Sequence, residues 1–111
     1  MSTYCTVFEK KYKTPICCFT SETYPSYVVP LFFSYLQEAL DACYRKGKSI
    51  YYYTLGLVFY ESMFDPTIIP GEDPGYSSYE IFVDFDELKI EWTDFVNIDG
   101  RQQEASLTVL V

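Results

Sequence analysis

The sequence has no histidine among its 111 residues, and this absence removes several kinds of chemistry. Imidazole is the base in Ser-His and Cys-His pairs and a common metal ligand, so none of these sites can be built here. Segments of the forms GxxxxGK[ST], GxGxxG, GxSxG and DxDxDG are also missing. The pairs Glu72-Asp73 and Asp84/Asp86 remain as candidates for acid–base work or cation binding, but adjacent acids are usually solvated. We therefore expect no enzyme activity, no catalytic residue, no cofactor and no metal site.

Basic residues are scarce as well. The chain has 8 Lys and Arg residues against 16 Asp and Glu residues, which gives a net charge of −8. A surface that binds nucleic acid must neutralise phosphates with positive charge. We therefore expect no direct binding of nucleic acid.

Long hydrophobic runs are absent too. The longest apolar stretches, residues 27–36 and 50–60, contain polar or turn residues and are shorter than the roughly 20 residues that span a bilayer. Residues 1–13 are polar and mixed, unlike a secretory signal. We expect a soluble protein with no membrane partner, located in the cytoplasm, or in the host cytoplasm if the source is viral.

Cysteine is present at four positions that match no CxxC motif: Cys5, Cys17, Cys18 and Cys43. Unpaired cysteine is among the most buried residue types, and the cytoplasm is reducing. Four buried thiols are the expectation. The alternatives are one or two disulfides, or a metal or redox site.

Aromatic residues are unusually abundant, at 20% of the chain, with 12 Tyr and 9 Phe. A chain of this size buries roughly two-thirds of its surface on folding, so we expect one domain over residues 1–111 with a single core. That core is too small for every ring. Tyrosine is also enriched in binding interfaces, and the loop residues Tyr24, Tyr27, Tyr76 and Tyr79 are the ones we expect to be reachable.

The first half of the chain gives two strand patterns and one helix pattern. Residues 3–12 and 16–20 predict strands of a hairpin. Residues 30–46 carry apolar side chains at three- and four-residue steps, which predicts the main helix, with Pro30 in its first position and Gly47 as its stop.

The middle of the chain is harder to assign. Residues 49–61 are apolar on both parities, which predicts a central strand covered on both faces, with a second buried helix as the alternative. Residues 62–78 contain three prolines and two glycines. They predict an acidic loop without regular structure.

The last third predicts a three-stranded meander. A turn at Asp99-Gly100 would pair Trp92 with Leu107 and Ile90 with Val109. A second turn at Asp86-Glu87 would pair Val83 with Ile90 and Ile81 with Trp92. Both turns place the same apolar residues on one face. A bulge with a continuing strand, or a short helix that begins near Asp86, is the alternative.

Together these patterns predict an α+β fold. Its main element is an antiparallel sheet of about five or six strands, with one main helix over residues 30–46 packed on one face.

The acidic residues are concentrated in one part of the sequence. Residues 1–60 carry four acids and six bases, a net of +2, whereas residues 61–100 carry eleven acids and one base, a net of −10. On the predicted meander, successive same-face acids lie roughly 6.8 Å apart, within a Debye length of about 8 Å. This spacing is similar to the repeating charge of a nucleic-acid backbone. The predicted partner-binding residues are Glu72, Asp73, Glu80, Asp84, Asp86, Glu87, Glu91, Tyr76 and Tyr79.

In composition, this short, acidic, tyrosine-rich chain resembles the small inhibitors that viruses and mobile elements direct at nucleases and other host-defence proteins, including DNA mimics and anti-CRISPR proteins. The resemblance covers no specific motif. It implies a non-enzymatic protein that occupies the basic, nucleic-acid-binding surface of a partner by competition.

Three alternatives remain. In the first, the acidic stretch serves only to keep the protein soluble. In the second, the protein is structural and self-associates, for example as a homodimer, through its aromatic surface or an open sheet edge. In the third, the protein is a small-molecule binder or an enzyme, with a pocket between helix 30–46 and the sheet.

Overall fold

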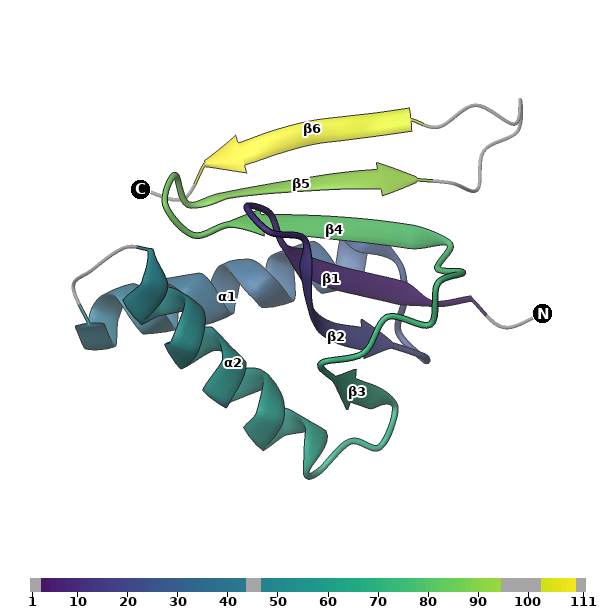
Figure 1. Cartoon of the computed structure of the whole chain (residues 1–111), viewed down its shortest axis with the longest axis horizontal. Coiled ribbons are helices and arrows are strands. Elements are labelled where there is room, and N and C mark those ends of the chain that lie inside the picture. Colours follow the sequence, from purple (N-terminus) through teal and green to yellow (C-terminus); the bar gives the residue numbers. More distant parts are fainter. Residues whose placement is uncertain (1–2, 44–46, 95–102, 110–111) are drawn as a thin grey trace.

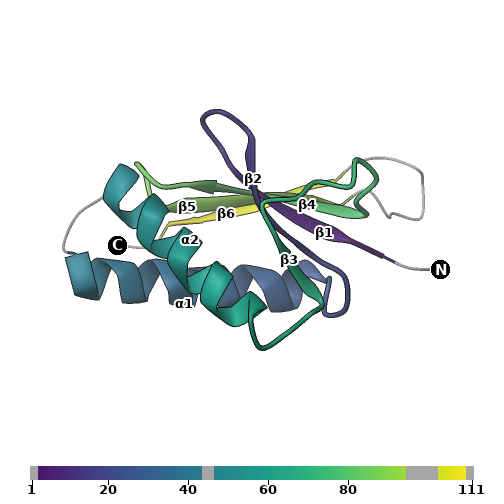
Figure 2. The same cartoon turned by 60° about the horizontal axis from the view of Figure 1, so that its bottom comes forward.

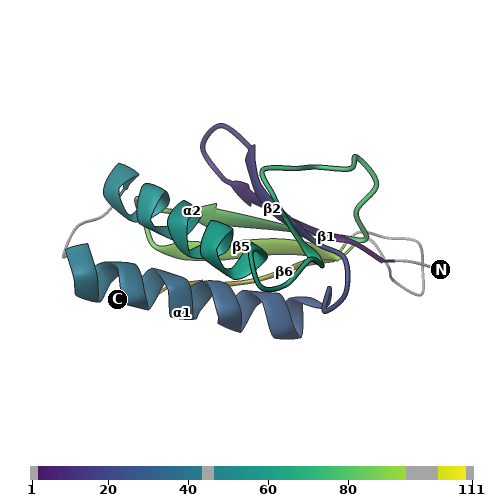
Figure 3. The same ribbon diagram turned by 90° about the horizontal axis from the view of Figure 1, so that it is seen from below.

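Six strands form one sheet in the order β3-β2-β1-β4-β5-β6, and two helices lie on one side of it (Figures 1, 2 and 3). The structure is a computed structural model that describes residues 3–43, 47–94 and 103–109. The elements are β1 (Cys5–Glu9), β2 (Thr14–Phe19), α1 (Pro25–Cys43), α2 (Lys48–Ser62), β3 (Ile68–Pro70), β4 (Tyr79–Asp84), β5 (Lys89–Asp94) and β6 (Gln103–Val109). The fold is α+β, as predicted.

The sheet is mixed, because its two central strands, β1 and β4, run parallel. The other four pairings are antiparallel. After the β1–β2 hairpin, the chain passes through both helices and β3 before β4 returns beside β1 (Figure 1). The expectation of a mainly antiparallel sheet is therefore confirmed only in part.

The main helix α1 covers the predicted residues up to Cys43 but begins earlier, at Pro25. The carbonyl oxygen of Tyr24 accepts the backbone N–H groups of Tyr27 and Val28 at 2.9 and 3.0 Å, which starts the helix. Pro25, and not Pro30, therefore occupies the first position, where a missing N–H has no consequence. Pro30 lies inside the helix. Residues 44–46, the predicted end, lie outside the described residues.

Residues 48–62 form a second helix, α2, so the predicted central strand over 49–61 is wrong and the helical alternative is correct. The buried residues of α2 are Ile50, Thr54 and Val58, spaced by one helical turn. Apolar residues of α2 that a central strand would have buried under a second layer are instead partly exposed. No helix in the described part of the chain is long and apolar enough to cross a membrane.

The β4–β5 hairpin has the predicted register, with Val83 opposite Ile90 and Ile81 opposite Trp92. The turn differs from a primed turn in detail. Its positive φ of 56° falls on Leu88, and the carboxylate of Asp84 accepts the backbone N–H groups of the next turn residues, Asp86 and Glu87, at 3.0 Å each. This local anchor explains how two residues that avoid positive φ can form the tip.

The predicted β5–β6 register is wrong. Ile90 lies opposite Thr108 and Trp92 lies opposite Ala105, with an irregularity in the ladder between Ile90 and Trp92. The pairs on both sides of this irregularity differ from the predicted ones, and the irregularity itself changes the register by one residue, which alternation alone cannot reveal. The predicted turn at Asp99-Gly100 lies outside the described residues.

The core lies between the helices and one face of the sheet. Cys5, Val7, Ile81, Val83 and Ile90 are each fully buried there. The other face, which we call the open face, is partly covered by residues 71–78. The hydroxyls of Ser77 and of Thr6, which is buried in β1, are hydrogen-bonded there, whereas the bond from the N–H of Gly71 to Ile16 at 2.8 Å extends the β2–β3 pairing at the sheet edge. The loop predicted over 62–78 also contains a short strand, β3, which pairs with β2.

Candidate functional site

Most of the predicted acidic residues belong to the open face or its rim. Glu80 and Asp84 alternate along β4 with the buried residues Ile81 and Val83, so they point away from the helices. Glu91 lies opposite Phe82 on the neighbouring strand, as the predicted register requires. Asp86 and Glu87 form the exposed tip of the β4–β5 turn, and Glu72 is exposed in the loop.

Folding brings lysines of the β1–β2 turn close to these acidic residues, although the two groups are far apart in the sequence. Because β1 lies beside β4, the β1–β2 turn places Lys10 against β4 and β5, where it forms an ion pair with Glu91. The hydrogen bond that Lys10 donates to Glu91 and the charges of Glu91 and Asp84 raise the pKa of Lys10. The pKa of Glu80 is raised, mainly by burial, and the charge of Lys13 in the same turn offsets part of this rise. Glu91 and Asp84 are therefore partly neutralised within the chain itself.

Two carboxylates, those of Asp73 and Glu80, line a recess of about 260 Å³. We call this recess the acidic hollow; its lining residues are Asp73, Gly75, Tyr76, Ser77 and Glu80. The carboxylate of Asp73 accepts the backbone N–H of Gly75 at 2.9 Å, which folds the loop back on itself. Burial and the negative charge of Asp73 raise the pKa of Glu80. Such a recess suits a cationic side chain.

Tyr76 stands at the edge of the acidic hollow with 69% of its surface exposed. Its ring packs edge-on against Tyr4, with 5.3 Å between the ring centroids. Tyr24 and Tyr27 are also exposed, as expected. The expectation for Tyr79 is wrong: it is only 6% exposed, because it begins β4 on the same face as Ile81. Tyr79 therefore belongs to the core, and not to a partner-binding surface.

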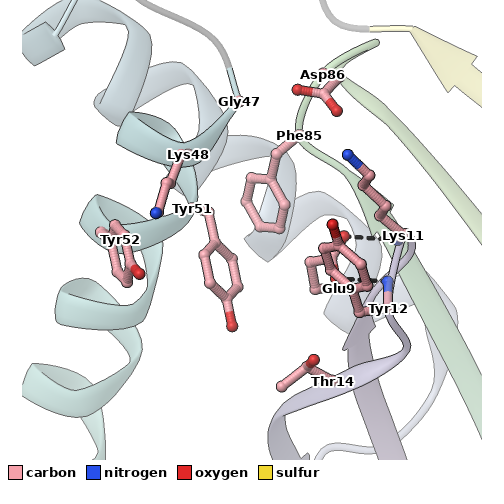
Figure 4. A pocket seen from close by; sticks show the side chains of 10 residues that line it. All are labelled: Glu9, Lys11, Tyr12, Thr14, Gly47, Lys48, Tyr51, Tyr52, Phe85 and Asp86. Atoms are coloured by element: carbon pink, nitrogen blue, oxygen red, sulfur yellow. Dashed lines mark hydrogen bonds between the residues drawn. The ribbon is translucent and has the colours of Figure 1, made fainter.

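A second recess lies at the end of the sheet where two turns meet the start of α2 (Figure 4). Both turns, residues 10–13 and 85–88, are anchored by the carboxylate that precedes them. Glu9 accepts the backbone N–H groups of Lys11 and Tyr12 at 2.6 and 2.9 Å, just as Asp84 does in the other turn. Gly47 then donates its N–H to the carbonyl oxygen of Phe85 at 2.8 Å and fixes the start of α2 beside them.

This turn-end pocket measures about 380 Å³. Its walls combine four aromatic rings with two lysines and two carboxylates; the lining residues are Glu9, Lys11, Tyr12, Thr14, Gly47, Lys48, Tyr51, Tyr52, Phe85 and Asp86. Charges of both signs balance one another, so the pocket favours no single class of ligand. Sequence reasoning missed it, because it assigned α2 as a strand and placed its candidate pocket under the other helix.

The outer side of α2 forms an apolar surface of exposed side chains. We call it the α2 apolar surface, and define it by Tyr52, Gly56, Phe59, Tyr60, Met63 and Phe64. The five large side chains are exposed by 57, 60, 58, 67 and 70%, respectively. Tyr60 and Phe64 contact each other, with 5.1 Å between their ring centroids. Isolated exposed apolar residues are common, whereas larger exposed apolar patches are typical of interaction surfaces.

The three cysteines whose side chains the structure describes give no sign of reactivity. Cys5, Cys17 and Cys18 are free and buried, as expected, and burial raises the pKa of each thiol. Since the thiolate is the nucleophile, a raised pKa makes these groups unreactive at neutral pH. The side chain of Cys43 lies outside the described residues. Within the described part of the chain, no group of three or more metal-ligating side chains comes together.

Comparison with known proteins gives no relative: no family model, no curated protein and no solved structure matches this chain.

Proposed function

We propose that this chain is a non-enzymatic binding protein whose acidic open face occupies a basic, nucleic-acid-binding surface of a partner protein. The acidic hollow is the observation that carries the proposal. It joins carboxylates from the 71–78 loop and from β4 around one recess, beside an exposed tyrosine. The mechanism is competition, in which no bond is made or broken.

An arginine or lysine side chain fits the chemistry of the hollow. Asp73 and Glu80 would accept its hydrogen bonds, and hydrogen bonds to charged groups contribute about 1.5–3 kcal/mol each. The face of the Tyr76 ring adds a cation–π contact of about 0.5–1 kcal/mol at an exposed site. Placing a cation between the two carboxylates would also relieve the repulsion between them, which is part of the reason that the pKa of Glu80 is raised.

The positions of the lysines indicate which part of the open face would contact the basic partner. Glu91 is already paired with Lys10, so the β5 side of the open face has less charge to offer. Glu72 lies next to Asp73, and Asp86 and Glu87 are exposed at the tip of the turn. Glu72 extends the negative field at the hollow, whereas Asp86 and Glu87 lie at the opposite end of β4 and add only to the wider field that would steer a basic partner towards the open face. A cytoplasmic inhibitor of a host nuclease, of the kind that phages and mobile elements use, would act in this way.

The test removes charge from the hollow without changing its shape. The variant Asp73→Asn/Glu80→Gln keeps an oxygen acceptor for Gly75 and loses two charges. The control variant Glu22→Gln/Glu38→Gln loses the same charge from exposed positions before and on α1. Each variant and the unchanged chain serve as bait in a bacterial lysate at low salt, and the retained protein is then titrated against its own nucleic acid.

We expect the unchanged chain to retain a nucleic-acid-binding protein and to displace its nucleic acid. The hollow variant should bind that protein at least tenfold more weakly, and the control variant should bind it within about twofold of the unchanged chain, since a factor of ten corresponds to about 1.4 kcal/mol. Equal binding by the two variants, or simultaneous binding of the nucleic acid and this chain, would contradict the proposal.

A second candidate function is favoured by a separate observation. The α2 apolar surface is what a structural or assembly protein would use to self-associate. The sheet edge formed by β3 is a weaker candidate for self-association, because β3 has only three residues and ends in Pro70.

A further inference from the structure

We propose that the α2 apolar surface is a homodimer interface, in which the α2 helices of two copies cross antiparallel at Gly56. The inference rests on the second candidate function and gives it a geometry. It involves none of the residues of the acidic hollow, so either proposal can fail without the other.

The first argument is the size of the surface. Its five large side chains are between 57 and 70% exposed. Aromatic side chains bury 150–250 Å² each, so the surface offers roughly 600 Å² of apolar area per copy. A typical monomer exposes a largest patch of about 300–600 Å², and a standard interface buries about 800 Å² per partner. The surface is therefore large enough to form the centre of a stable interface.

The second argument is the glycine in its middle. Gly56 lies in the interior of α2, where glycine is a poorer helix former than alanine. Its φ is not positive, and a Cβ atom built there would meet nothing within 4 Å. The described part of the chain therefore contains nothing that requires a glycine here. A second helix crossing at this point would require it, because a missing side chain lets two backbones approach closely.

The third argument is that the surface is complementary to itself. By the helical period of 3.6 residues, positions 52, 56, 59, 60 and 63 fall in one stripe along α2. A two-fold axis at Gly56 places residues whose numbers sum to 112 at the same level, so Tyr52 meets Tyr60 of the other copy. In this isologous arrangement the Tyr52–Tyr60 contact occurs twice, once on each side of the crossing at Gly56.

Charge at the two ends of the stripe supports the antiparallel direction. Lys48, at the start of α2, would lie level with Phe64 of the other copy and close to its Asp65. Both Lys48 and Asp65 are exposed. The antiparallel pairing thus brings opposite charges together, and it also opposes the two helix dipoles. A parallel pairing would place lysine beside lysine and aspartate beside aspartate, so the surface matches a second copy in one direction only.

Sedimentation velocity of the full chain between about 1 and 100 µM tests the interface. We expect the unchanged chain to dimerise, and Phe59→Ser/Tyr60→Ser to be monomeric over the same range. The control Tyr27→Ser removes an exposed ring from α1 and should leave the dissociation constant unchanged within about twofold. A monomeric unchanged chain at the highest concentration would overturn the proposal and leave the surface to a different protein.

Gly56→Ala tests the crossing point, because it should have opposite effects on folding and on association. Alanine fits the free space beside the isolated helix, so thermal unfolding at a concentration below the dissociation constant should move to higher temperature. The same methyl group would separate the two crossing helices and raise the dissociation constant at least tenfold. A variant that is more stable and dimerises as well as the unchanged chain would contradict a crossing at Gly56.

Discussion

The outer side of α2 and the open face of the sheet are two exposed regions with opposite chemistry. The α2 apolar surface has five large apolar side chains that are more than half exposed. The open face carries carboxylates that are partly paired with lysines of the β1–β2 turn. Apolar contact acts at short range and is insensitive to dilute salt, whereas charge acts at long range and is screened. Two regions of the same chain could therefore bind different partners, or one partner and a second copy, without competing.

Within α2, the exposure of a side chain, and not its apolar character, decides whether it belongs to the core or to the α2 apolar surface. The buried side of α2 and its outer side are equally apolar in sequence, yet Val58 is 2% exposed and its neighbour Phe59 is 60% exposed. The first contributes to the core and the second to a surface. Substitutions at these two adjacent positions should therefore have very different consequences.

The largest effect is expected from an aspartate on the buried side of α2. Val58→Asp would place an unpaired charge in the core and should destabilise the fold by about 4 kcal/mol or more, since buried unpaired charge is among the most damaging changes. Phe59→Asp, on the outer side, should change the stability of the monomer by less than about 1 kcal/mol. Urea unfolding followed by circular dichroism, at a concentration where the chain is monomeric, measures both. Similar losses from the two variants would show that Phe59 is packed and would remove the distinction between the two sides.

A smaller effect, but one that separates the two regions directly, is expected from salt. Raising the salt concentration from about 0.01 M to about 1 M shortens the Debye length from ~30 Å to ~3 Å. Binding of a poly-arginine peptide, used as a basic probe for the acidic face, should weaken at least tenfold. The dimer should be unchanged or tighter, because burial of apolar surface is not screened. Peptide binding that does not depend on salt would contradict a charge-based contact at the open face. A dimer that dissociates at high salt would contradict an apolar interface on α2.

Some parts of this fold could be predicted from the sequence because one physical signal was sufficient. The β4–β5 register follows from alternation, since a slip of one residue would turn Val83 and Ile90 out of the core. The helical period of α1 is equally clear, because one side is buried and the other is solvated. The positions of Glu80 and Asp84 on the open face follow from the same alternation.

Other parts depend on contacts that no local pattern contains. The period of α2 is hidden because its outer residues, such as Tyr52 and Phe59, are apolar although they are exposed. The parallel pairing of β1 with β4 joins segments about 75 residues apart, and it is this pairing that brings Lys10 to Glu91. The acidic hollow was anticipated only as a list of acids. Its shape depends on the hydrogen bonds that fold residues 71–78 across the sheet.

The smallest expected effect concerns the stability of the fold and the protonation of Glu80. Burial and the charge of Asp73 raise its pKa above the ordinary value of 4.5. The folded state therefore binds this proton more tightly than the unfolded state, and stability decreases as the pH rises from the unfolded pKa through the folded pKa. Glu80→Gln should be more stable than the unchanged chain at pH 7 by less than about 1 kcal/mol, and the difference should vanish below about pH 4. Urea unfolding at both pH values measures it.

Asp65 provides the control of opposite sign. Hydrogen bonds from the side chain and backbone of Thr67 lower its pKa, so its carboxylate stabilises the fold at neutral pH, and this contribution is lost as the pH falls through the folded pKa. Asp65→Asn should therefore be less stable than the unchanged chain at pH 7, whereas Glu80→Gln should be more stable. A carboxylate that destabilises its own fold is expected where another molecule uses the charge. If Glu80→Gln proves no more stable than the unchanged chain, the hollow is ordinary solvated surface, and the acidic-face proposal loses the site on which it rests.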